Sequence, residues 1–181
     1  MSKKRLGVSL LVGIAAWVLL GGAPRPTAAE EPDRYTNKDK GFSITFPADW
    51  ERKEGQMGTT VLALSPQEGP ADQSRGNVNV TIEDLPKTRS VDEYVVAALG
   101  TLRKVLTDLE EHENSAMNVA DAPAKRLIFS HRMGAIKVKA MQCVLVRGTR
   151  GYVITCSAAP DQFDNYRPKF DEIVHSFRFE P

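Results

Sequence analysis

Hydrophobic residues along this chain alternate with polar ones in several short segments, and in two longer segments they recur at helical spacing. Alternation with a period of two is typical of a half-buried strand, whereas recurrence every three to four residues is typical of an amphipathic helix. Alternation predicts strands at residues 35–36, 41–46, 61–65, 77–85, 124–131, 135–147 and 152–158, with one more within 110–119.

Turn residues join these strands into hairpins. The predicted turns lie at residues 37–40, 133–134 and 148–151, and residues 69–76 are a loop by composition. Strands that follow one another through short turns pair antiparallel. The sequence therefore predicts a mostly antiparallel sheet and an α+β fold class.

The stretch GFSITFPADW, residues 41–50, is interpreted as scaffold and not as a site. Phe42, Ile44 and Phe46 share one face of the predicted strand. Because Pro47 cannot donate to a sheet ladder, the strand should stop there. Trp50 is then expected to fold back over the edge of the core.

A capping box marks the start of the first predicted helix, where Ser90 is followed three residues later by Glu93. The second helix is predicted to have Asp161 as its cap. Pro168 should start a new helical segment or kink the helix, because its ring removes a hydrogen bond. The apolar positions are Val91, Tyr94, Val95, Ala98, Leu102, Val105, Leu106 and Leu109 in the first helix, and Phe163, Tyr166, Phe170, Ile173, Val174 and Phe177 in the second.

The first 29 residues have the pattern of a secretory signal peptide. Lys3, Lys4 and Arg5 precede an apolar run of about 15 residues, shorter than the ~20 that span a bilayer, and small residues end the segment at Ala29. We therefore expect an exported protein without a transmembrane helix in the mature chain. Its location would be periplasmic, or the thylakoid lumen in a photosynthetic cell.

Removal of this segment would leave one domain. Cleavage after Ala29 leaves 181 − 29 = 152 residues, which is enough to bury a core. Residues 30–40 are predicted to be a lead-in with the first short strand, and residues 41–181 a single domain.

The charge balance does not suggest a nucleic-acid partner, and we expect none. The chain has 24 basic and 23 acidic residues, and 4 of the basic ones lie in the signal segment, so the mature chain has 24 − 4 = 20 against 23, a net charge of −3. Nucleic-acid binders usually carry a clustered basic face. One group of basic residues is interpreted as ordinary solvated surface because acidic residues are interspersed with it: Arg103, Lys104, Arg132, Lys137 and Lys139.

The sequence indicates no metal, cofactor or catalytic site. His112, His131 and His175 are spread over different elements, whereas a zinc site needs three or four converging ligands. We interpret His131 as a partly buried structural histidine, and the acidic run at 110–113 as a solvated face.

One residue pair suggests nucleophilic catalysis and one motif suggests glycosylation, but both have simpler structural interpretations. Ser130 and His131 are strand neighbours on opposite faces, which is the wrong geometry for a nucleophile and its base. Asn79 with Thr81 forms a glycosylation sequon, but it is more simply the polar face of a strand.

The two cysteines, Cys143 and Cys156, are a possible disulfide. If Thr149 and Arg150 are the central turn residues, the two cysteines lie directly opposite each other at a non-hydrogen-bonded position, where the sulfurs could meet. An oxidising envelope would favour the bond. The alternative is two reduced thiols packed as small apolar side chains.

The chain resembles the PsbP-like and DcrB-like superfamily over nearly the whole mature part. The resemblance rests on four stretches that occur in order: GFSITFPADW, NVNVTIEDLP, GYVITCSA and FDNYRPKFDEIVHSFRF. The resemblance implies an α/β/α sandwich with a central antiparallel sheet. It also implies a binding or assembly protein without a shared catalytic site, since members include extrinsic photosystem II subunits, assembly factors and bacterial envelope proteins.

Three functional hypotheses follow. The first is an exported, non-enzymatic protein that binds or helps to assemble an envelope or membrane-associated protein complex. In a photosynthetic organism, this would be an extrinsic photosystem II subunit or assembly factor. The second is a carrier of an apolar small ligand, which would need a pocket between the sheet and a helix instead of a filled core. The third, an unrecognised hydrolase, is disfavoured because no convergent polar triad can be drawn.

Overall fold

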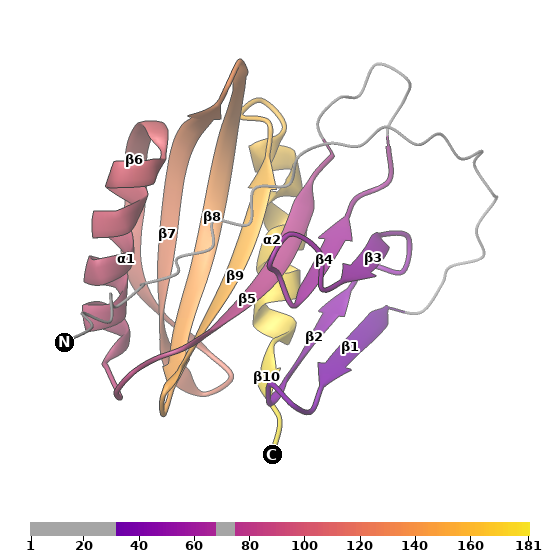
Figure 1. Ribbon diagram of the computed structural model, residues 1–181. Coiled ribbons are helices and arrows are strands. Elements are labelled where there is room, and N and C mark those ends of the chain that lie inside the picture. The colour runs from indigo at the N-terminus through magenta and orange to yellow at the C-terminus, as the bar shows by residue number, and fades with distance from the viewer. Residues whose placement is uncertain (1–31, 68–74) are drawn as a thin grey trace.

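The computed structural model describes residues 32–67 and 75–181 of the chain (Figure 1). The signal peptide expected at 1–29 and most of the loop expected at 69–76 lie outside these residues. The described part contains two antiparallel sheets and two helices.

Seven strands form the larger sheet, in the order β3-β4-β5-β9-β8-β7-β6 (Figure 1). Every neighbouring pair in it is antiparallel, as predicted. The strands are β3 (Glu51–Glu54), β4 (Val61–Leu64), β5 (Asn77–Asp84), β6 (Thr107–Val119), β7 (Ala122–Met133), β8 (Ile136–Arg147) and β9 (Arg150–Ala158).

Three strands form a small second sheet, in the order β1-β2-β10. The first hairpin consists of β1 (Asp33–Asn37) and β2 (Phe42–Phe46), as the sequence predicts, and β10 (Arg178–Phe179) pairs with β2. The pairing of the last strand with the first hairpin was not predicted, because two residues are too few to show a period.

The two helices cover opposite faces of the larger sheet (Figure 1). Helix α1 (Val91–Val105) packs on β6, β7 and β8, and helix α2 (Phe163–Ser176) packs on β2, β8 and β9. Strand β8 shows the two faces: Ala140 and Val144 belong to the core under α1, whereas Met141 and Leu145 belong to the core under α2. The three layers are the expected α/β/α sandwich.

Aromatic side chains fill the layer between α2 and the sheets. Phe42 stacks on Phe177 at 5.7 Å between ring centroids, and Trp50 meets Phe170 edge-on at 6.4 Å. The predicted face of β2 is buried, and so is Trp50. The stretch 41–50 is therefore scaffold, and Trp50 closes the core edge as predicted.

Helix α1 starts as predicted and ends earlier. The Ser90 side chain accepts from the Glu93 N–H, and the Glu93 carboxylate accepts from the Ser90 N–H, which completes the capping box. The helix ends at Val105, not near Leu109, and β6 begins two residues later. Leu106 and Leu109 still pack against the core under α1, so their apolar spacing reflects burial on that core and not helix.

Helix α2 begins at another cap than predicted and continues through Pro168. Its N-cap is Gln162, whose side chain makes no capping bond, so the assignment of Asp161 as cap is wrong. Pro168 lies inside one continuous helix and starts no new segment. The loss of one backbone donor is tolerated because Phe163 and Phe170 are buried on either side of it.

Two hairpin turns lie one residue away from their predicted positions. The β7–β8 turn is formed by Gly134 and Ala135, and the β8–β9 turn by Gly148 and Thr149, closed by the pair of Arg147 and Arg150. Gly148 has φ of +60°, a left-handed value that the first position of a tight hairpin turn favours. The glycine therefore lies in the turn itself and not in the flanking strand.

Helices in the described part are too short or too polar to cross a membrane.

Candidate functional site

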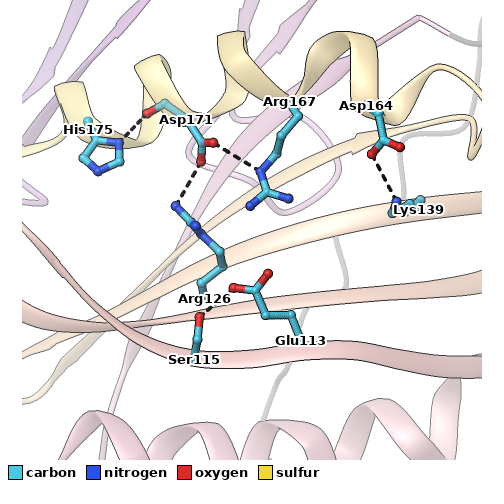
Figure 2. A network of polar contacts seen from close by, with 8 residues as sticks. All are labelled: Glu113, Ser115, Arg126, Lys139, Asp164, Arg167, Asp171 and His175. Carbon is cyan, nitrogen blue, oxygen red and sulfur yellow. Dashed lines mark hydrogen bonds and ion pairs between the residues drawn. The ribbon is translucent and has the colours of Figure 1, made fainter.

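Charged side chains from α2, β6, β7 and β8 meet on the α2 face of the sheet, beside the helix (Figure 2). We name this group the α2–β7 cluster; it comprises Glu113, Ser115, Arg126, Lys139, Asp164, Arg167, Asp171 and His175. Figure 2 shows the side chains of the helix and of the strands pointing toward one another. The cluster joins α2 to three strands that come earlier in the sequence.

Asp171 is the centre of the cluster. One carboxylate oxygen accepts from Arg126 Nη2 at 3.0 Å, and the other accepts from Arg167 Nε at 3.2 Å. Arg167 and Asp171 share one side of α2 because they are four residues apart. The side chains of Arg126, Asp171 and Arg167 are 20%, 32% and 28% exposed, so the group is partly shielded and still reachable from solvent.

The remaining contacts extend the cluster along α2. Lys139 Nζ lies 3.2 Å from an oxygen of Asp164 and 4.6 Å from the centre of the Phe163 ring. His175 Nδ1 lies 2.7 Å from the backbone oxygen of Asp171, one helical turn away. These contacts fix the positions of the charged groups along the helix.

Glu113 stands at the sheet side of the cluster. Its carboxylate accepts from the Ser115 hydroxyl at 2.6 Å, and it forms no ion pair with the described residues. The cluster therefore includes one acidic group that has no cationic partner among the described residues.

The two cysteines lie beneath this surface as free, buried thiols. Cys143 is opposite Ile154 and Cys156 is opposite Met141, so the two cysteines are offset by two residues instead of being directly opposite. The predicted disulfide does not form in the structure. The physical reason is the turn at Gly148, which shifts the register and leaves the thiols at diagonal positions, where Cα atoms lie ~7–8 Å apart.

Burial makes both thiols poor nucleophiles. It raises the pKa of Cys143 to about 12, an effect that the Arg126 guanidinium partly offsets. Burial also raises the pKa of Cys156, helped by Cys143 and by the Asp171 carboxylate. Because the thiolate is the reactive form, these cysteines act as packing groups.

A serine–histidine contact exists, but not between the sequence neighbours. Ser130 Oγ lies 2.6 Å from His112 Nε2, across the β6–β7 pair. Sequence reasoning missed this pair because His112 lies in a register shift of β6 that strand periodicity does not reveal. Ser130 is buried, and no carboxylate of the described part contacts the His112 ring, so a nucleophile, base and orienting group are not assembled.

His131 is a structural histidine, as interpreted from the sequence. It is buried under α1, its ring lies 6.0 Å from that of Phe129, and its Nδ1 lies 3.4 Å from the Arg132 carbonyl oxygen. Burial lowers the pKa of His131. The ring therefore favours its neutral form in the folded protein.

Ion pairs engage Glu110 and Glu111 of the acidic run and four of the five basic residues. Lys137 pairs with Glu110 at 3.3 Å and Arg103 with Glu111 at 2.7 Å. Arg132 pairs with Asp108, and Lys139 with Asp164. Nowhere in residues 32–67 and 75–181 do three His, Cys, Asp or Glu side chains gather as they would around a metal ion.

The polar residues of β5 lie on a strand as interpreted from the sequence, and Asn77, Asn79 and Thr81 are buried. Asn79 is 1% exposed, and neither its amide nitrogen nor its oxygen has a hydrogen-bond partner. Asn77 is also buried and accepts from the Ser157 hydroxyl at 2.9 Å. Because Asn79, the asparagine of the sequon, is buried, it is not available for glycosylation in the folded protein.

Comparison with known proteins supplies a family and a fold. A family model described as DcrB matches residues 43–176. The sequence has no significant match among curated proteins.

Three solved structures share the fold at low sequence identity. The solution structure of cyanobacterial PsbP (CyanoP) from Synechocystis sp. PCC 6803 has a TM-score of 0.62 at 17% identity and covers 88% of this chain and 98% of that one. PA94 from Pseudomonas aeruginosa, a protein of unknown function and putative regulator, has a TM-score of 0.59 at 14% identity, with 84% and 99% covered. LpqN, involved in cell envelope biogenesis of Mycobacterium tuberculosis, has a TM-score of 0.58 at 16% identity, with 83% and 91% covered.

Proposed function

This chain belongs to the DcrB family, and we propose that it is an exported, non-enzymatic protein that binds and helps to assemble an envelope or membrane-associated protein complex. The observation that carries the proposal is the α2–β7 cluster. It is a fixed, partly shielded group of charges on the surface of a packed domain. In this proposal the cluster recognises another protein and performs no chemistry on it.

The geometry of the two arginines suits a carboxylate of the partner. Arg126 uses Nη2 on Asp171, and Arg167 uses Nε on the same residue, so each guanidinium has further N–H donors that these two bonds do not use. Guanidinium groups bind carboxylates through paired hydrogen bonds, and partial burial strengthens such contacts relative to open water. An acidic side chain of the partner is the natural ligand of this surface.

Glu113 adds a second specificity element. Because its carboxylate has no cationic partner in the described part, it would attract a lysine or arginine of the partner and repel an acidic group at that position. A partner surface with an acidic residue next to a basic one therefore fits the cluster better than a uniformly charged one.

The packed cores favour binding over carriage of an apolar ligand. The layer under α2 is occupied by fully buried side chains such as Phe42, Phe163 and Phe170. The layer under α1 is occupied by a second apolar cluster that includes Leu102 and Phe129. A carrier would need open volume at one of these places.

The relatives support an extracytoplasmic role. LpqN is described as involved in cell envelope biogenesis, and CyanoP is a cyanobacterial PsbP. Together with the signal pattern at residues 1–29, they favour export, to the periplasm or, in a photosynthetic organism, to the thylakoid lumen. In such an organism the complex would be a photosynthetic one.

Affinity capture from the native envelope tests this proposal. The tagged protein is purified from the envelope fraction without chemical cross-linking, and co-purified proteins are identified by mass spectrometry against a tag-only control. The proposal predicts a defined membrane-associated or envelope complex that is enriched reproducibly. Recovery of the tagged protein alone, at native expression, would contradict it.

A further inference from the structure

The two edges of the seven-stranded sheet are protected very differently. An edge strand presents unpaired N–H and C=O groups, and proteins usually guard it with charges, bulges, prolines or short length. At one edge, β3 has four residues, Glu51–Glu54, and all of them are charged. At the other edge, β6 has 13 residues.

Strand β6 itself consists of a guarded half and an open half. Residues 107–113 contain two register shifts and the acidic residues Asp108, Glu110, Glu111 and Glu113. Residues 114–119, with the sequence NSAMNV, pair regularly with β7 and contain no charged residue and no proline. We name this second half the open edge.

The turn that follows β6 shows which backbone groups of the open edge face outward. Ala120 and Asp121 form a two-residue turn with φ of 53° and 56°, the pattern of a type I′ hairpin. In such a hairpin the flanking pair, Val119 and Ala122, is hydrogen-bonded, and the pairs then alternate. Asn118, Ala116 and Asn114 therefore direct their N–H and C=O groups away from β7.

Pro123 agrees with this assignment. It lies opposite Asn118 in the register of β6 and β7. At a position that makes no hydrogen bond to β6, the missing N–H of proline costs nothing in that ladder. The open edge therefore has three consecutive outward-facing residues, each with one donor and one acceptor.

We propose that two copies of this chain pair antiparallel through their open edges, around a two-fold axis at Ala116. In this register Ala116 faces its own copy, and Asn114 faces Asn118 of the second copy. All three outward-facing residues then form hydrogen-bonded pairs, which gives 3 × 2 = 6 backbone hydrogen bonds. In a register shifted by two residues, one of the three outward-facing residues would have no partner within the open edge of the second copy.

The side chains are compatible with this self-pairing. Ala116 is small at the axis, where two identical side chains meet. Asn114 and Asn118 are exposed, and their amides can hydrogen-bond across the junction. On the other face, half-buried Ser115 would lie opposite Met117, whose remaining surface the added strand would cover. The open edge contains no charged residue, so no like charges oppose each other within it.

Sedimentation of protein purified from the envelope tests the proposal. Over concentrations from about 10 μM to about 1 mM, where weak dimers equilibrate, the wild-type protein should form a reversible dimer. Ala116→Pro removes the outward N–H at the axis without removing a β6–β7 hydrogen bond, so it should weaken the dimer about 10-fold or more while the fold persists. Ala116→Thr, which keeps the N–H, should dimerise like wild type.

Cysteine cross-linking tests the register and does not depend on the proline variant. Ala116→Cys places two thiols face to face across the axis, and mild oxidation should convert most of the protein to a covalent dimer. Asn118→Cys is the matched control, since its thiol faces Asn114 of the second copy and should cross-link at least about 10-fold more slowly. A protein that stays monomeric throughout the concentration series, or equal cross-linking of the two variants, would overturn the proposal.

Discussion

Arg126 on β7 and Asp171 on α2 form a 3.0 Å ion pair that ties the helix to the sheet, and Arg167 shares the same carboxylate. Removal of the acid should leave two neighbouring guanidinium groups without their counter-charge. Because all three side chains are partly exposed, Asp171→Asn should lower the free energy of unfolding by only about 0.5–1.5 kcal/mol.

Urea unfolding measures this difference. The loss should shrink in ~1 M salt, because salt screens the repulsion between the two arginines. Asp84→Asn is the control, since Asp84 pairs with Arg150 at a more exposed place and its loss should cost less than about 0.5 kcal/mol. A salt-independent loss at Asp171 would contradict the ion-pair account.

Loss of an aromatic side chain from the core should lower the free energy of unfolding more than loss of the Asp171 ion pairs does. Phe46 is 1% exposed, so Phe46→Ala should cost about 3–5 kcal/mol of unfolding free energy. Val96 on α1 is 72% exposed, and Val96→Ala should change stability by less than about 0.5 kcal/mol. If Phe46→Ala costs less than about 1 kcal/mol, the stretch 41–50 is surface and not scaffold.

His131 should make stability depend on pH. Its folded pKa is lowered by burial, so the unfolded chain, with a pKa of about 6.5, binds the proton more readily. Stability contributed by the neutral ring is therefore present above about pH 6.5 and is lost as the pH falls below it.

The variant His131→Phe keeps an aromatic ring and removes the titration. It should flatten the slope of unfolding free energy against pH between about 5 and 7, as measured by denaturant titration at several pH values. Lys169→Gln, an exposed change on α2, should leave the slope unchanged. An unaltered slope in His131→Phe would show that other groups cause the pH dependence.

Both cysteines should be recovered as thiols. Protein purified without reductant and unfolded in an alkylating agent should gain two labels, at Cys143 and Cys156, because the register of β8 and β9 keeps them at diagonal positions. In the folded protein, labelling should be slow because both side chains are buried. An unlabelled protein, 2 Da lighter than the dithiol form, would reveal a disulfide.

Export should leave a shortened chain. Intact-mass measurement of envelope-derived protein should place the N-terminus near Glu30. Full-length protein confined to the cytoplasm would contradict both the predicted signal peptide and the extracytoplasmic role.

Much of the fold could be predicted because the signals for strands and helix starts lie within short stretches of sequence. Alternating residues such as Phe42 and Ile44 identify a strand face, and Ser90 with Glu93 identifies a helix start, because each signal lies within a few residues. The resemblance to DcrB-like proteins is confirmed by the DcrB family model, and the expected fold is the one shared with CyanoP, PA94 and LpqN.

The features that sequence reasoning missed depend on register and on distant elements. The turn at Gly148 shifted by one residue, which moved Cys143 and Cys156 by two positions relative to each other. The contact of His112 with Ser130 arises at a strand irregularity. The cluster at Asp171 joins residues that are 45 positions apart, and no local pattern connects them.

The central claim is that the protein binds its partner through the α2–β7 cluster, and quantitative affinity capture tests it most directly. The double variant Arg126→Gln and Arg167→Gln is compared with wild type and with Lys169→Gln, a control on the same helix whose ion pair with Glu172 lies on the exposed surface. We predict that the double variant folds, yet recovers its envelope partner at least about 10-fold less than wild type and control do. Equal recovery of the partner by all three proteins would contradict the claim.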